Sequence, residues 1–151
     1  MSTYSFLDVE CTLVGPGASL QLGNGSGSAE EGIDIDMVED KDGMTVGSDG
    51  AIMHSLRAGN AGSMTIRLLK TSPMNAKLQD LYNFQKTGSA FWGQNVIVVS
   101  DTQRGDVITG TVMAFNRQTP VKYAKDGNIN EWKLQGNVEQ LLGSGVPDAS
   151  A

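Results

Sequence analysis

The sequence predicts a mainly β protein, a barrel or sandwich of antiparallel strands with one flanking α-helix at about residues 72–86. Several segments alternate apolar with polar side chains, which is the two-residue period of a half-buried strand. The chain of 151 residues contains 19 glycines, a content typical of turns and bulges between strands. This length fits one domain, so we expect residues 1–151 to form a single unit.

The first predicted strand shows the alternation clearly. In residues 4–14, apolar side chains occupy every second position from Leu7 to Leu13, and Asp8 and Glu10 fall on the opposite face. Gly110 is expected to mark a bulge or bend within a long later strand. Further strands are predicted at 19–22, 32–38, 63–69, 95–101 and 106–116, and in a hairpin over 121–136 with Asp126 and Gly127 at its turn.

The helix is predicted from its ends as well as from its period. Ser72 suits the N-cap and Pro73 the first helical position, and Thr87 and Gly88 stop the helix. One apolar stripe, which ends in a polar residue, is expected to pack on the sheet: Met74, Leu78, Leu81, Tyr82 and Gln85.

Residues 39–62 follow a different pattern. The turn sequences DKDG and GSDG lie only a few residues apart, with short segments between and after them. We interpret the region as an extended hairpin, or arm, that leaves the body of the domain. Its apolar residues argue against disorder and need a surface to pack on, for which a neighbouring subunit is a good candidate. They are Met44, Val46, Ile52, Met53 and Leu56. At the other end of the chain, residues 146–151 are expected to form a loose tail.

The charge is unevenly distributed along the chain. The net charge is −6, with ten acidic residues and one lysine in residues 1–50. This asymmetry favours head-to-tail self-association, unless the two halves of the sequence do not map onto separate surfaces. Specific binding to a nucleic-acid duplex would normally show a basic excess, so it is not expected.

A search for catalytic and metal-binding patterns gives no catalytic, cofactor or metal site, and we expect no enzyme. The chain has one histidine, His54, and one cysteine, Cys11, too few for an ordinary zinc site or a disulfide. Cys11 is expected to be a buried, inert thiol. Asp34 and Asp36 could act as paired glycosidase carboxylates, but the wet face of a sheet explains them better. A calcium loop in DIDMVEDKDG is outweighed by a solvated turn.

Targeting patterns are also missing from the sequence. The first residues lack a basic region followed by a long apolar core, and no run of apolar residues reaches transmembrane length. We therefore expect a protein of the reducing cytoplasm, or of a particle assembled there, without a membrane partner.

Four segments carry a family resemblance. They read GPGASLQLGNGSGSAEEGIDI, DKDGMTVGSDGAIMHSLRAGNAGSMTIRLLKTSPMNAKLQDLYNFQ, FWGQNVIVVSDTQRGDVI and AFNRQTPVKYAKDGNINEWKLQGNVEQLLGSG. Together they closely resemble a family of bacteriophage structural proteins, the tail tube proteins of contractile-tailed phages. The resemblance covers about Tyr4 to Gly145.

The resemblance implies a β-barrel or sandwich with one flanking helix, a fold shared with type VI secretion tube proteins. It implies hexameric rings that stack into the inner tail tube, through which phage DNA is ejected into the host. The arm would reach into the adjacent ring, so Met44, Val46, Ile52, Met53 and Leu56 would be inter-ring contacts.

The resemblance also implies partners and a location. The partners would be other copies of the chain, the tail sheath protein, and the baseplate and tail terminator proteins. Tape measure protein and phage DNA would occupy the lumen without specific binding. The location would be the virion tail, after assembly in the host cytoplasm. The alternative is another ring component on the same fold, such as a tail terminator, a baseplate hub or a secreted type VI-like tube protein.

Acidic residues are the expected lining of such a tube. A wall that lets DNA slide should repel phosphates, whereas a basic wall would retain them by counterion release. The candidates on wet strand faces are Asp8, Glu10, Asp34 and Asp36.

Overall fold

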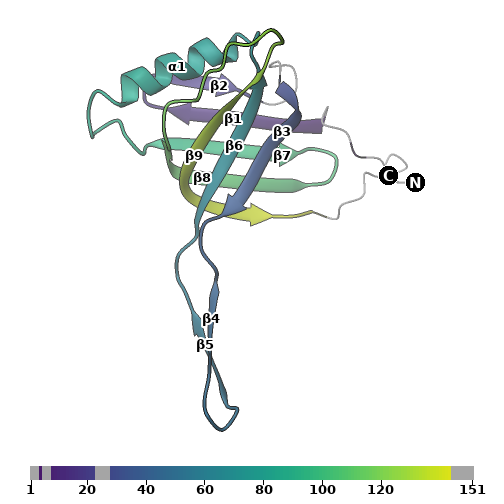
Figure 1. The fold of residues 1–151 in the computed structure, drawn as a ribbon, viewed down its shortest axis with the longest axis vertical. Helices are drawn as coiled ribbons and strands as arrows, with labels where there is room; N and C mark the ends of the chain where they lie inside the picture. Colours follow the sequence, from purple (N-terminus) through teal and green to yellow (C-terminus); the bar gives the residue numbers. More distant parts are fainter. Residues whose placement is uncertain (1–3, 5–7, 23–27, 144–151) are drawn as a thin grey trace.

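The structure is a computed structural model that describes Tyr4, residues 8–22 and residues 28–143, without the side chains of residues 28–31. The fold is mainly β, with one helix, as the sequence predicts (Figure 1). The expected tail at 146–151 lies outside the described residues. The elements are β1 (Val9–Gly15), β2 (Ala18–Gln21), β3 (Ser28–Met37), β4 (Asp42–Val46), β5 (Ile52–Leu56), β6 (Ala61–Leu69), α1 (Met74–Gln85), β7 (Asn95–Asp101), β8 (Asp106–Phe115) and β9 (Ile129–Leu141).

One antiparallel sheet of seven strands bends over itself to form the body of the molecule. Its strand order is β2-β1-β7-β8-β9-β6-β3, and in Figure 1 β3 and β6 cross in front of β1, β7 and β8. The long strand β9 belongs to both layers, because residues 129–137 pair with β6 and residues 134–141 pair with β8. Among the described residues, the edge strands β2 and β3 do not pair with each other. The sheet therefore stays open, so the part of the prediction that allowed a closed barrel is wrong.

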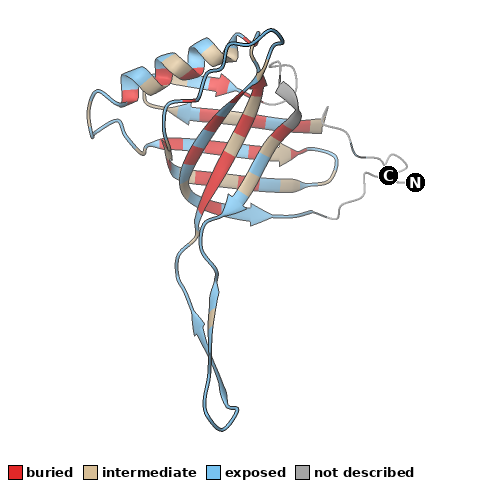
Figure 2. Ribbon diagram, viewed as in Figure 1, coloured by how far each residue is buried: buried red, intermediate tan, exposed pale blue. Residues whose placement is uncertain are grey.

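The core fills the space between the two layers. Alternate residues of each strand point inward, which Figure 2 shows as buried and exposed bands along the strands. The largest buried side chain is Trp132 on β9, which is 1% exposed and meets Phe115 edge-to-face, with 6.1 Å between the ring centroids. Its indole N–H donates to Asn75 Oδ1 of the helix at 3.0 Å. Trp132 thus joins both layers and the helix.

A bulge in β8 helps the sheet to bend. The pairing of β8 with β9 shifts between Thr111 and Ala114, and Val112 has a φ of 54°, in the left-handed region. Gly136 faces the bulge, where an added Cβ would lie 2.6 Å from the carbonyl oxygen of Val112. Only glycine leaves room for this backbone. The bulge was expected at Gly110 and lies just beyond it.

The helix packs across one end of the body, as the apolar stripe predicts. Leu78, Leu81 and Gln85 are buried. The helix begins one residue later than expected, at Met74, with Pro73 as the N-cap residue. The Ser72 hydroxyl still accepts a hydrogen bond from the backbone N–H of Met74 at 3.3 Å.

A buried amide pair fastens the last turn of the helix to β7. Gln85 and Asn95 are both 0% exposed and donate to each other's side-chain oxygen, at 2.6 and 2.8 Å. Asn95 also donates to the carbonyl oxygen of Met113 at 3.1 Å. Every polar atom of the pair finds a partner, which is what makes its burial tolerable.

Residues 116–128 form a loop where the sequence predicts the first strand of a hairpin. The β8 pairing continues only to Asn116, whose N–H donates to the Lys133 carbonyl at 2.9 Å. Pro120 has no N–H to extend the ladder. Thr119 instead donates its hydroxyl to the carbonyl oxygen of Glu131, and the chain beyond it runs over the helix end of the body (Figure 1).

Candidate functional site

The arm stands away from the body as a two-stranded hairpin (Figure 1). β4 and β5 pair from Asp42 opposite Leu56 to Val46 opposite Ile52. The tip closes with a hydrogen bond of 2.7 Å from the Gly47 N–H to the Ala51 carbonyl. In isolation a two-stranded hairpin is marginally stable, so the arm is a segment that gains from a second surface.

The cross-strand register sorts the apolar residues of the arm onto its two faces. Residues directly opposite each other share a face, and successive residues alternate. Met53 pairs with Thr45, and none of the other four apolar residues of the arm lies on the face of this pair. The other four share the opposite face, where each is between 57% and 83% exposed. We call this set the arm apolar face: Met44, Val46, Ile52 and Leu56.

His54 lies on the same face and contacts Asp42 in an exposed pair. Its Nδ1 lies 2.9 Å from Asp42 Oδ2, across the hairpin, and both side chains are more than half exposed. An exposed pair of this kind contributes little to stability. In the described part of the chain, no group of three or more His, Cys, Asp or Glu side chains is placed to hold a metal ion.

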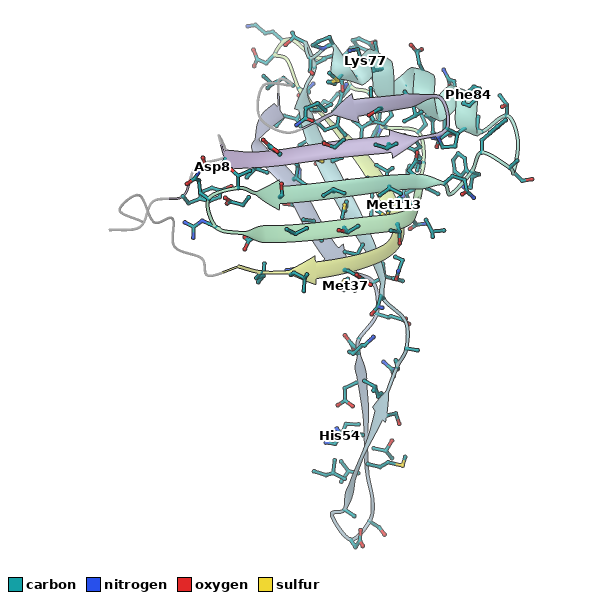
Figure 3. All side chains as sticks on the ribbon, turned by 180° about the vertical axis from the view of Figure 1, so that it is seen from behind. Asp8, Met37, His54, Lys77, Phe84 and Met113 are labelled. Carbon is teal, nitrogen blue, oxygen red and sulfur yellow. The ribbon has the colours of Figure 1, made fainter. Side chains whose placement is uncertain are left out.

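The four acidic residues expected to line a lumen do not lie together. Asp34 and Asp36 are exposed on the outer face of β3, in the front layer of Figure 1. Glu10 is exposed on β1, in the other layer, and Asp8 lies just before that strand (Figure 3). The two pairs therefore belong to opposite outer faces of the molecule.

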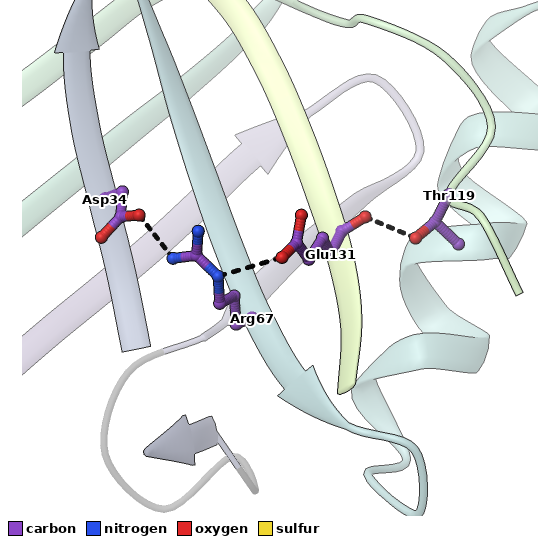
Figure 4. Close-up of polar contacts among 4 residues, drawn as sticks. All are labelled: Asp34, Arg67, Thr119 and Glu131. Carbon is purple, nitrogen blue, oxygen red and sulfur yellow. Dashed lines mark hydrogen bonds and ion pairs between the residues drawn. The ribbon is translucent and has the colours of Figure 1, made fainter. Parts of the chain in front are cut away.

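The outer face of β3, β6 and the first half of β9 carries charges of both signs, and Arg67 forms ion pairs with two of its acids. Arg67 Nη1 lies 2.5 Å from Asp34 Oδ2, and Arg67 Nε lies 3.2 Å from Glu131 Oε1 (Figure 4). The hydrogen bond with Asp34, and to a smaller extent the one with Glu131, raises the pKa of Arg67. One guanidinium thus bridges β3, β6 and β9 and neutralises part of the acidic charge of Asp34.

The opposite outer face carries no basic residue. β1, β2, β7, β8 and residues 134–141 of β9 contain no lysine, arginine or histidine. The pairing registers turn short polar and β-branched side chains outward there, with only two acids, Glu10 and Glu139. We call this the cation-free face. Its outward residues are Glu10, Thr12, Val14, Ser19, Gln21, Val96, Val98, Ser100, Val107, Thr109, Thr111, Asn137, Glu139 and Leu141.

The two ends of the long axis differ in charge. Residues 36–57, which include the arm, contain five acidic residues against Lys41 and Arg57. Residues 70–86 and 120–127, at the helix end, contain five lysines against Asp80 and Asp126. Figure 3 shows the separation, with Lys77 on the helix and His54 far along the arm. Part of the charge asymmetry of the sequence thus lies at opposite ends of the molecule.

The single cysteine is a core residue, as its position in the strand predicts. Cys11 is 0% exposed, and burial raises the pKa of its thiol to about 12. No helix in the described residues is long and apolar enough to cross a membrane.

Comparisons with known proteins agree with this geometry. Two solved structures share the fold. A chain from the cap that terminates the anti-feeding prophage tube has a TM-score of 0.53 at 11% identity, with 95% of each chain covered. A chain of the anti-feeding prophage baseplate has a TM-score of 0.56 at 14% identity, with 97% of this chain and 100% of the other covered.

Sequence comparisons give one further result. No curated protein matches the chain. The family model described as bacteriophage PhiTE tail tube protein matches residues 1–143. The chain therefore belongs to the family of the bacteriophage PhiTE tail tube protein.

Proposed function

We propose that the protein is the repeating subunit of an inner tail tube, in which hexameric rings stack to form the conduit for phage DNA. Membership of a phage tail tube family makes it a structural tail component. The observation that carries the finer proposal is the arm. Its apolar face is more than half exposed at all four residues, and the body of the same chain does not cover it. A second copy in the adjacent ring is the surface that would cover it.

The arm can supply enough free energy to hold rings together. Full burial of a Leu, Ile, Val or Met side chain contributes roughly 1.5–3 kcal/mol before the cost of ordering. Because every ring would repeat the contact around its circumference, modest contacts become strong by multivalency. The opposite charges of the arm end and the helix end favour stacking in one direction, arm end to helix end.

The free edges of the sheet offer a way to close each ring. β2 and β3 each pair on one side only within the described residues, which leaves backbone donors and acceptors on the other side. Because the two edges are different surfaces, contact between them is head-to-tail and generates a ring when the rotation closes. The sheath protein would surround the stacked tube, and the terminator and baseplate proteins would lie at its two ends.

A second candidate is a ring component present in one layer only, such as a terminator or a baseplate hub. The observation that favours it is the fold shared with the cap and baseplate chains of the anti-feeding prophage. The two candidates differ in the number of copies per particle.

Electron cryo-microscopy of purified tails, with this chain traced in the density, tests the proposal. We expect many stacked hexameric rings along the tail, with each arm on the adjacent ring. A single ring of six copies at one end would establish the second candidate instead. Density in which the chain forms no ring would contradict both.

For the lining of the tube, we propose the cation-free face, which includes Glu10, rather than the face with Asp34 and Asp36. Six copies of a surface without lysine or arginine could not displace the counterions condensed on the DNA, so counterion release would not retain the DNA. The other face would turn the half-buried Arg67 and the exposed Lys133 toward the lumen.

Charge reversal distinguishes the two faces. Replacing Glu10 and Glu139 with lysine is expected to lower the rate of DNA ejection at least tenfold, because six copies would place twelve new cations in every ring of the lumen. The rate is measured by dye uptake of DNA released from purified phage. Asp36→Lys is the matched control and should leave ejection unchanged. Slow ejection from the control alone would assign the lumen to the other face.

A further inference from the structure

A groove of about 600 Å³ lies where the arm joins the body. It is built from four parts of the chain that meet only in the folded protein: the residue after β3, the residues around the start of β6, the β8 bulge and the middle of β9. Its lining is mostly apolar or glycine, and Val38 and Val112 are both 65% exposed on it. The lining residues are Val38, Gly59, Asn60, Ala61, Gly62, Val112, Gln135, Gly136 and Asn137.

The β8 bulge that bends the sheet places its one non-glycine residue of positive φ, Val112, on this groove. A β-branched residue with a φ of 54° is a conformational outlier, and glycine would adopt this backbone without penalty. The strained residue directs its isopropyl group toward solvent on the groove rather than into the core. Strain of this kind is typical of binding sites.

An exposed aromatic side chain that could fill this groove lies at the other end of the molecule. In the loop of residues 116–128, Tyr123 is 86% exposed, more than any other large apolar side chain described. Its ring is held in place, because Lys70 Nζ lies 3.9 Å from the ring centroid and also donates to the Lys122 carbonyl. An exposed but oriented tyrosine between two lysines, Lys122 and Lys125, is a typical anchor of a protein interface.

We propose that the groove at the root of the arm receives Tyr123 from a second copy of the chain in the adjacent ring. The proposal rests on the proposed function, since stacking arm end to helix end brings these two ends together. Charge supports the pairing: Glu39 lies against Gly59 of the groove, with Asp40 next to it in sequence, opposite the lysines that flank Tyr123. The arm would then contact the side of the neighbouring subunit, and the groove would fix the position of that subunit relative to the ring below or above it.

Disulfide trapping tests the contact directly. The native Cys11 is buried, so cysteines introduced at Val112 and Tyr123 would be the reactive thiols. Tails assembled from the V112C/Y123C double variant and oxidised are expected to give a ladder of covalent multimers on a non-reducing gel. The matched control, Y123C with E139C, should give none. Tails that form without a ladder would overturn this inference and leave the proposed function intact, whereas wild-type protein that forms no rings would overturn both.

A second pair of variants keeps the inference testable if the cysteine variants fail to assemble. Tyr123→Ala should leave the thermal unfolding midpoint of the monomer unchanged, because the ring is exposed, and should lower the yield of sedimentable tubes at least tenfold. Tyr123→Phe keeps the ring and should assemble normally. Val112→Gly should leave the midpoint unchanged or raised, because it removes the strain, and should still weaken assembly. Normal assembly of both Tyr123→Ala and Val112→Gly would contradict the inference.

Discussion

Replacing Leu56 with aspartate is expected to abolish ring stacking while leaving the subunit folded. Leu56 is 83% exposed on the arm apolar face, so the free subunit loses almost no packing when it is changed. In the assembled tube the same position would be buried against the next ring. The substitution would remove about 1.5–3 kcal/mol of apolar burial and add the cost of desolvating an unpaired carboxylate, several kcal/mol more. Repeated around a ring, this penalty exceeds what the remaining contacts can offset.

The measurement is the fraction of protein in sedimentable tubes, with circular dichroism and thermal unfolding to confirm that the monomer is intact. Thr45→Asp is the matched control. It adds the same charge to the same hairpin, on the opposite face with Met53, and should reduce stacking much less. If Leu56→Asp assembles as well as the wild-type protein, the arm apolar face is not an inter-ring contact.

Replacing Trp132 with alanine should have the largest effect on folding itself. Trp132 is 1% exposed, packs edge-to-face on Phe115 and hydrogen-bonds to Asn75. A buried tryptophan truncated to alanine typically costs about 3–5 kcal/mol, since a large cavity remains. The same change would leave the side-chain oxygen of Asn75 without this donor. For a domain of this size such a loss is a large share of the free energy of unfolding, about 5–15 kcal/mol in total.

The chain supplies its own comparison in the other tryptophan, Trp92. Trp92 is 37% exposed and touches Tyr82 edge-to-face, so Trp92→Ala should cost well under half as much. The free energy of unfolding is read from urea denaturation followed by far-UV circular dichroism, because the substitutions remove fluorophores. Equal destabilisation by the two changes would show that the core is not centred on Trp132.

Local patterns predicted the elements of this protein well. The segment 95–101 has the bounds of β7, because a short and nearly continuous apolar run that ends at a turn is typical of a strand. The amphipathic stripe likewise identified the buried face of the helix, down to Gln85 at its end. The turn sequence GSDG at residues 47–50 correctly indicated a hairpin, because it forms the tip between β4 and β5.

The parts that could not be predicted depend on contacts between distant segments. Alternation placed Glu10 and Asp34 on wet faces, but only the strand order shows that the two faces point in opposite directions. Only the β4–β5 register separates Met53 from the other apolar residues of the arm. The groove at the arm root was missed because four separate segments form it, and the one local signal was the glycine content near residues 59–62 and at Gly136.

The strand β9 has a mechanical consequence. One continuous backbone runs through both layers and is hydrogen-bonded to β6 along its first part and to β8 along its last. The layers therefore cannot slip past each other unless ladder bonds break on β9. A pull on the arm enters the body through β3 and β6, crosses the β6–β9 hydrogen bonds and then follows the β9 backbone into the opposite layer. Under axial load we expect such a subunit to fray first at its outermost strands and to keep its central three strands until last.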